Sequence, residues 1–78
     1  MERKDRVALY GMVRRWVRQG PWADREYVLE CIRHAHNGRP DGCLVTNDNM
    51  WMLRQYRNGV SADPEQLVSE SLACREGE

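Results

Sequence analysis

Apolar residues recur with the spacing of an α-helix between residues 6 and 19, and this periodicity limits the folds open to the chain more than any other feature. On a helical wheel these residues span an arc of about 120°, the width of a stripe that faces a protein core. The stripe comprises Leu9, Tyr10, Val13, Trp16 and Val17. The other side of the wheel carries Lys4, Arg14, Arg15 and Arg18, with Gly11 among them. Gly20 and Pro21 predict the end of this helix, because glycine suits a left-handed cap and proline cannot continue a helix.

Two further helices are predicted from their start signals. Asp24 suits the N-cap of a helix that ends at the sequence HNG, residues 36–38, and its apolar face comprises Val28, Cys31, Ile32 and Ala35. Asp63 caps a last helix, with Pro64 at the first helical position. The apolar stripe of that helix is thinner and comprises Leu67, Val68, Ser71, Leu72 and Cys74.

The segment between these helices, residues 43–59, is open to two interpretations. We prefer a helix over about residues 48–57, because strong helix formers predominate there and no β-branched residue occurs. Asp48 suits the start of this helix, and Asn58 and Gly59 suit its end. In the alternative, the stretches CLVT and NMWML form a hairpin around ND. The sequence GRPDG, residues 38–42, is a turn in either case, because its glycines can supply positive φ and its aspartate can bond locally.

These segments predict an all-α fold, a compact bundle of four short helices, with an α+β fold and a small hairpin at about 43–53 as the alternative. The 78 residues make a single domain, 1–78, whose ends at 1–4 and 75–78 we expect to fray. A chain of this length buries only about 60% of the surface that its unfolded form exposes. So small a core leaves little room for a deep catalytic cleft.

Charge is unevenly distributed along the chain. Residues 1–19 carry a net charge of +4 and residues 61–78 a net charge of −4, although the formal charge of the whole is +0. Eleven of the basic residues are arginines, which form forked hydrogen bonds and stack where lysine acts as a point charge. We therefore expect either that the two ends neutralise each other or that the molecule has two faces of opposite charge.

The side-chain types favour a surface that binds another macromolecule. Trp, Tyr, Met and Arg together make 21 of the 78 residues, and these types are enriched at the centres of protein–protein interfaces. Trp51 lies about 160° from Leu53 on the wheel of the predicted third helix, so both cannot face one core. The candidate partner-binding residues are Arg14, Arg15, Arg18, Trp22, Trp51, Tyr56 and Arg57.

The sequence VRRWVRQG, residues 13–20, resembles the recognition helix of small excisionase and MerR-type DNA-binding proteins. In those families an Arg/Trp-rich helix enters the major groove and a wing that bears an aromatic residue follows it. The sequence REYVLE, residues 25–30, is similar to such a wing, although the spacer before it is shortened to PWAD. The resemblance implies a DNA-binding regulator that uses residues 12–20 as its recognition helix.

Metal binding and catalysis have weaker signals. Cys31, His34, His36 and Cys43 have the chemistry of a zinc site, but His36 points about 140° away from Cys31 on a helical wheel. The chain contains no Gly-rich phosphate loop, HExxH, GxSxG or paired-carboxylate arrangement. We therefore expect a non-enzyme with no metal and no cofactor, and the zinc set stays the alternative.

These observations predict a small protein-binding module that acts by occupying a surface of its partner. A protein partner is the first expectation, nucleic acid the alternative, and a homodimer is compatible with both. Small size and a helical build are similar to the general profile of phage-encoded inhibitors of host systems, including anti-CRISPR proteins. The N-terminus lacks a signal-peptide pattern, and no stretch approaches the roughly 20 apolar residues of a membrane span. We therefore expect a cytoplasmic protein without a membrane span.

Overall fold

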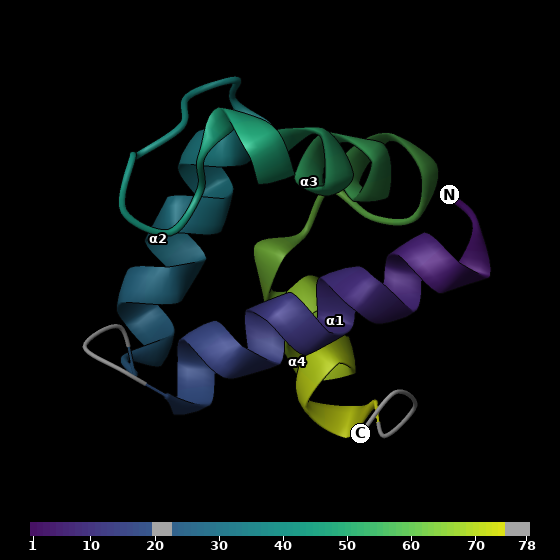
Figure 1. Ribbon diagram of the computed structural model, residues 1–78, viewed down its shortest axis with the longest axis horizontal. Helices are drawn as coiled ribbons and strands as arrows, with labels where there is room; N and C mark the ends of the chain where they lie inside the picture. The colour runs from purple at the N-terminus through teal and green to yellow at the C-terminus, as the bar shows by residue number, and fades with distance from the viewer. Residues whose placement is uncertain (20–22, 75–78) are drawn as a thin grey trace.

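Four helices form where helix-spaced apolar residues lie between turn signals. The structure, a computed structural model, describes residues 1–19 and 23–74. The helices are α1 (Arg3–Arg18), α2 (Arg25–His36), α3 (Asn47–Gly59) and α4 (Pro64–Ala73), arranged as in Figure 1. The prediction of an all-α bundle is confirmed. The alternative hairpin at 43–53 is wrong, because most of that segment is helical and the described residues contain no strand.

Side-chain caps define where α2 and α4 begin. Asp24 accepts hydrogen bonds from the backbone N–H groups of Glu26 at 3.0 Å and Tyr27 at 3.5 Å. Asp63 accepts from the N–H of Glu65 at 3.0 Å, and Pro64 occupies the first helical position. Both predicted N-caps are therefore confirmed. Each satisfies backbone donors that the first helical turn leaves without a partner.

Helix α3 begins earlier than predicted. Its N-cap is Thr46 rather than Asp48, and the Thr46 backbone N–H donates to Asn49 Oδ1 at 2.9 Å. Asn49 also donates from its amide nitrogen to the Leu44 carbonyl at 3.2 Å. This side chain ties the start of α3 to the preceding loop, whose Leu44 and Val45 side chains are buried.

The loop between α2 and α3 depends on Asp41 and two glycines. Gly38 and Gly42 adopt φ values of +80° and +78°, a region that L side chains rarely occupy. Asp41 Oδ1 accepts three backbone N–H bonds at 2.9 Å, from Cys43, Leu44 and Val45. The predicted turn chemistry of GRPDG is thus confirmed, and it turns two apolar residues back into the core.

The core is formed by one face of each helix together with that loop. Helix α1 packs mainly against α4, and α2 packs mainly against α3. The predicted stripe of α1 is buried at Leu9, Val13 and Trp16, and its Tyr10 and Val17 are partly buried. The buried apolar residues contributed by the rest of the molecule are Val28, Leu29, Cys31, Ile32, Ala35, Leu44, Val45, Leu53, Tyr56, Leu67 and Val68.

A single carboxylate joins α1, α3 and α4. Both Tyr10 and Tyr56 donate hydroxyl hydrogen bonds to Glu70 Oε2, the second at 3.0 Å, and Gln66 donates to Oε1 at 2.9 Å. The two tyrosine rings meet edge to face, with centroids 6.3 Å apart. Burial and the adjacent carboxylate raise the pKa of Tyr10 to about 12, and the Tyr10 hydrogen bond lowers the pKa of Glu70. The hydroxyls therefore stay protonated donors and Glu70 stays an ionised acceptor.

Residues 25–30 do not form the wing that the DNA-binding resemblance implies. Residues 25–30, which were compared with a wing, form the first half of α2. Asp24 caps this segment as a helix, and its apolar residues repeat with helical spacing, so a strand there would lose both contributions. The hypothesis that residues 12–20 act as a recognition helix therefore lacks the wing that residues 25–30 were expected to supply.

Replacing Glu70 tests how much the tyrosine–carboxylate contact stabilises the fold. We expect Glu70→Ala to lower the free energy of unfolding by about 2–3 kcal/mol, because it leaves two partly or wholly buried hydroxyls without their acceptor. Glu65→Ala, in the same helix, is the matched control and removes an exposed pair with Arg25 and an acidic side chain from the first turn, both of which contribute little. Urea denaturation of both variants measures the difference. Equal destabilisation by the two changes would contradict this account.

Candidate functional site

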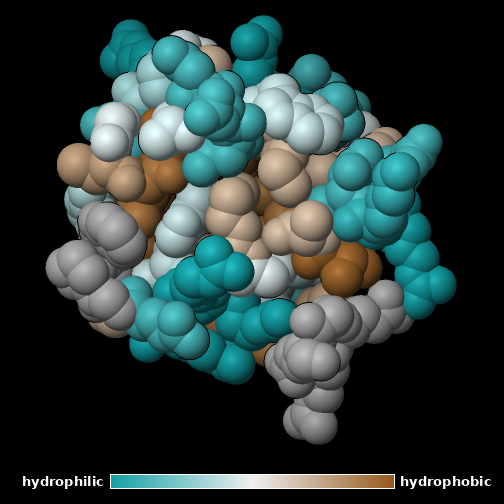
Figure 2. All heavy atoms as spheres, in the orientation of Figure 1, coloured by the Kyte–Doolittle hydropathy of each residue, from teal (hydrophilic) through white to brown (hydrophobic). Residues whose placement is uncertain are grey.

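Two adjoining hollows lie on the solvent side of α1 and form the candidate site, here called the α1 groove. They measure about 240 Å³ and 400 Å³. They share Gly11, Arg14 and Arg15. The other lining residues are Arg18 and Gln19 in the first hollow, and Lys4, Val7, Ala8 and Met12 in the second. Figure 2 shows the face that α1 crosses, with apolar side chains in the middle and strongly hydrophilic ones beside them.

The charge of the α1 groove has one sign. Four of its lining residues are cationic, namely Lys4, Arg14, Arg15 and Arg18, and no carboxylate of residues 1–19 or 23–74 lines either hollow. A concave surface lined by like charges concentrates the field and favours anionic groups. The prediction that these arginines share one side of the helix is confirmed, and the groove adds apolar contact area at Val7, Ala8 and Met12.

Two of the predicted arginines also have a structural task. Arg14 donates from Nη1 to the carbonyls of Ser71, at 3.2 Å, and Cys74, while Arg18 Nη2 lies 3.5 Å from the Leu72 carbonyl. Helix α4 has no basic residue in its own last turn. Cations of α1 therefore stabilise the negative end of the α4 dipole. These contacts join the two arginines to backbone carbonyls of α4.

Arg15 is the predicted residue that remains most available. Its side chain is exposed and, within residues 1–19 and 23–74, it makes no hydrogen bond or ion pair. Lys4 is also exposed and lies 3.8 Å from Glu2 in a surface pair whose side chains are 81% and 74% exposed. Such surface pairs contribute little to stability, so both cations are available to an anionic partner.

The remaining predicted residues do not join this groove. Tyr56 is fully buried, so the expectation that it stays outside the core is wrong: it follows Leu53 by three positions, on the same side of α3. Arg57 donates to the His36 carbonyl and caps the end of α2. Trp51 is 46% exposed on α3, as predicted, but does not line the groove. Trp22 lies outside the described residues.

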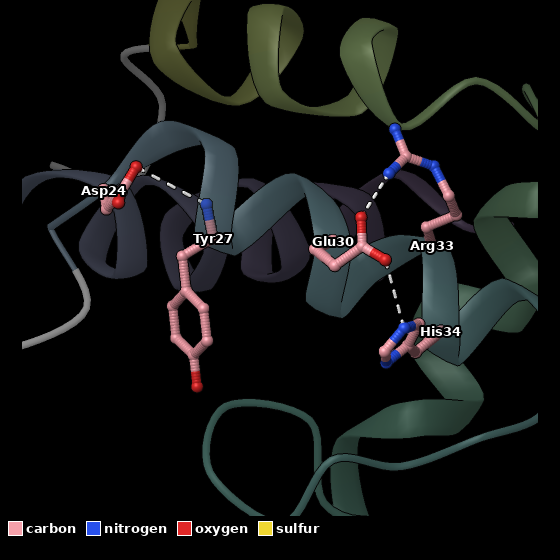
Figure 3. A network of polar contacts seen from close by, with 5 residues as sticks. All are labelled: Asp24, Tyr27, Glu30, Arg33 and His34. Atoms are coloured by element: carbon pink, nitrogen blue, oxygen red, sulfur yellow. Dashed lines mark hydrogen bonds and ion pairs between the residues drawn. The ribbon is translucent and has the colours of Figure 1, made fainter.

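The four residues of the zinc alternative are dispersed. No three of them lie close enough to share a metal ion in the described part of the chain, which contains all four. His34 Nε2 lies 3.2 Å from Glu30 Oε1, and Arg33 binds the other oxygen of Glu30 at 2.6 Å, as drawn in Figure 3. His36 points into the core, where neither ring nitrogen has a hydrogen-bond partner among the described residues.

Cys31 and Cys43 occupy contrasting environments. Cys31 is 4% exposed, and burial together with the Asp41 carboxylate raises the pKa of its thiol to about 12. Cys43 is exposed in the loop. Tyr27, which points away from α2 in Figure 3, contacts the Cys43 thiol, and this hydrogen bond raises the pKa of Tyr27 to about 12. The pKa of the Cys31 thiol is therefore shifted away from the depressed value that a catalytic nucleophile has.

The accessibility of the thiols gives a direct check of this part of the structure. We expect Cys43 to react with iodoacetamide at pH 8 at least about a hundredfold faster than Cys31, because the thiolate is the reacting form and the buried thiol rarely ionises. Peptide mass spectrometry after timed quenching measures both rates in one sample. Comparable rates would show that the loop does not cover Cys31.

The buried imidazole of His36 predicts a pH-dependent stability. Burial lowers the pKa of His36, and the Arg57 guanidinium adds to this effect. Below the ordinary histidine pKa of about 6.5 the unfolded chain therefore binds a proton that the folded chain resists. Stability is fully present above that pH and falls, by up to about 1.4 kcal/mol per pH unit, as the solution is acidified below it.

Urea denaturation between pH 7.5 and 5 measures the effect of His36. We expect His36→Leu to flatten the pH dependence in this range. His34→Gln is the control, because His34 is exposed and should leave the slope unchanged. A slope that survives in His36→Leu would assign the pH dependence to other groups.

None of the described helices is both long and apolar enough to cross a bilayer. Comparisons of the chain with protein-family models, with curated proteins and with solved structures find no match. The interpretation of the α1 groove therefore depends on the chemistry of its own residues.

Proposed function

We propose that the protein is a non-enzymatic binding module that acts by covering an acidic surface of a protein partner with the α1 groove. The observation that carries the proposal is the lining of this groove: four cations with apolar contact area between them, and no carboxylate among the lining residues that the structure describes. An acidic protein surface offers carboxylates for the cations and apolar groups for Val7, Ala8 and Met12. The arginines supply forked donors that match carboxylates well.

The size of the molecule is compatible with this role. Its accessible surface is 4713 Å², and an interface of ordinary size takes about 800 Å² from each partner. One side of the bundle would supply that area. Trp51 is exposed on α3 but does not line the groove, so it is not part of the proposed contact.

A protein partner is favoured over nucleic acid by the charge balance. The chain has a formal net charge of +0, so it gains little from the counterion release that drives binding to duplex DNA. DNA binding through residues 12–20 is the second candidate and is an outcome of the test below.

A module of this kind would inhibit its partner by occupying a functional surface, in the manner of phage-encoded inhibitors such as anti-CRISPR proteins. This likeness rests on small size and helical build. As part of the same proposal, we expect the protein to act in the cytoplasm. A second copy of the chain is one partner that the experiments below test.

Reversing the charge of Arg15, which lines both hollows and makes no ion pair or hydrogen bond with the described residues, tests the proposed function. We expect Arg15→Glu to weaken partner binding by about 10–100-fold, because a carboxylate would then face the partner's acidic groups. Arg54→Glu is the matched control, since Arg54 is an exposed arginine on α3 outside the groove. Tagged protein captures the partner from the source cells, and calorimetry with the purified partner compares the variants.

A titration with duplex DNA at 50 mM and 200 mM salt accompanies this experiment. The proposal expects no sizeable DNA affinity even at the lower salt. Tight DNA binding that falls steeply with salt, with no protein captured, would overturn the proposal in favour of the DNA-binding alternative. Equal losses in Arg15→Glu and Arg54→Glu would show that the groove is not the contact.

A further inference from the structure

We propose that the α1 groove receives an acidic amphipathic helix of the partner, laid along α1 with its backbone passing close to Gly11. This inference rests on the proposed function and adds the kind of segment that is bound. Three features of α1 carry it: a glycine that the fold does not require, the spacing of the cations around it, and the apolar residues beside it.

Nothing in the described part of the chain requires a glycine at position 11. The glycines with positive φ are Gly38 and Gly42 in the described part, so Gly11 has an ordinary helical backbone. A Cβ added at Gly11 would lie 3.8 Å from Arg14 Nη2, which is an ordinary contact with the end of a flexible side chain. Glycine inside a helix is less stabilising than alanine, so Gly11 lowers the stability of α1 without a compensating contact among the described residues.

We infer that the glycine serves binding at the solvent side of α1. Gly11 and the exposed Ala8, one turn earlier, leave the backbone of α1 uncovered by large side chains where the two hollows meet. Small residues at such a position let the backbone of a second helix approach closely. An added side chain at Gly11 would occupy the space that the two hollows share.

The cations lie at regular distances from this gap. Lys4 precedes Gly11 by seven residues and Arg18 follows it by seven, so each lies about 10.5 Å away along the helix axis. Arg15 lies four residues after Gly11, about 6 Å along the axis. A partner helix that runs beside α1 repeats its own side chains with the same rise. Carboxylates about seven residues to either side of a small residue would therefore meet these cations.

The apolar neighbours favour an amphipathic protein helix over a phosphate backbone. Val7 and Met12 are half-buried in the wall of the second hollow, and Ala8 is exposed between them. A phosphodiester backbone supplies anions at this depth but no apolar groups to cover these side chains. Apolar residues one turn from the carboxylates of a partner helix would cover them.

The first test separates stability from binding at one position. We expect Gly11→Ala to raise Tm by about 3–6 °C, because alanine is the better helix former, while partner affinity falls at least about tenfold. Gly59→Ala is the matched control, since an added Cβ at Gly59, in the last turn of α3, also meets only ordinary contacts. It should leave binding unchanged. Gly11→Ala with higher Tm and unchanged affinity would overturn the inference while leaving the proposed function intact.

The second test identifies the bound segment. Benzoylphenylalanine replaces Gln19, which lines the first hollow, or in a separate variant Gln55, an exposed glutamine on α3. Each variant is irradiated in extract of the source cells, and mass spectrometry identifies the joined peptide. We expect an adduct from Gln19 alone, to a helical segment rich in Asp and Glu.

Every other result counts against the inference. An adduct from Gln19 to nucleic acid, to a second copy of this chain or to a segment without acidic residues overturns the inference. An adduct from Gln55 alone moves the contact away from α1, so the inference fails and the binding-module proposal survives. No adduct from either variant, together with no captured partner, counts against both.

Discussion

The contact between Glu70 and two tyrosine hydroxyls holds the arrangement of the bundle. It links α1, α3 and α4 through one carboxylate oxygen, and the tyrosine rings pack against each other beside it. In so small a core the apolar contacts alone leave the relative rotation of helices loosely specified, whereas a buried polar contact has few satisfactory geometries. The rotation of α1 matters most, because it decides that Trp16 faces inward and that Arg15 faces solvent.

The cations of α1 are divided between stabilising the fold and remaining available. Arg14 and Arg18 contact carbonyls at the end of α4, whereas Lys4 and Arg15 stay exposed. The charge asymmetry along the chain predicted either that the two ends neutralise each other or that the molecule has two faces of opposite charge. The described contacts of Arg14 and Arg18 with α4 are with its backbone carbonyls. A helix end offers partial negative charge at fixed positions, which holds a guanidinium in place better than a mobile surface carboxylate does.

Local features of the sequence predicted most of the fold and a smaller part of the site. The caps at Asp24 and Asp63, the apolar stripes and the exposure of Trp51 follow from spacing along one element, and the structure confirms them. The roles of Tyr56, Arg57, Arg14 and Arg18 depend on which helix lies beside which, and that information is not local. Tyr56 alone had a local signal that was missed, since its position three residues after Leu53 places it on the core side.

The end of α4 is completed by residues that precede it by more than fifty positions, since Arg14 contacts the carbonyls of Ser71 and Cys74. A peptide that contains only this last helix would lack the cations that complement its dipole, and ten residues are too few for a stable helix in water. The final helix therefore forms only when the first one docks on it. Folding of this chain should accordingly be all-or-none, with its two terminal helices ordering together rather than in succession.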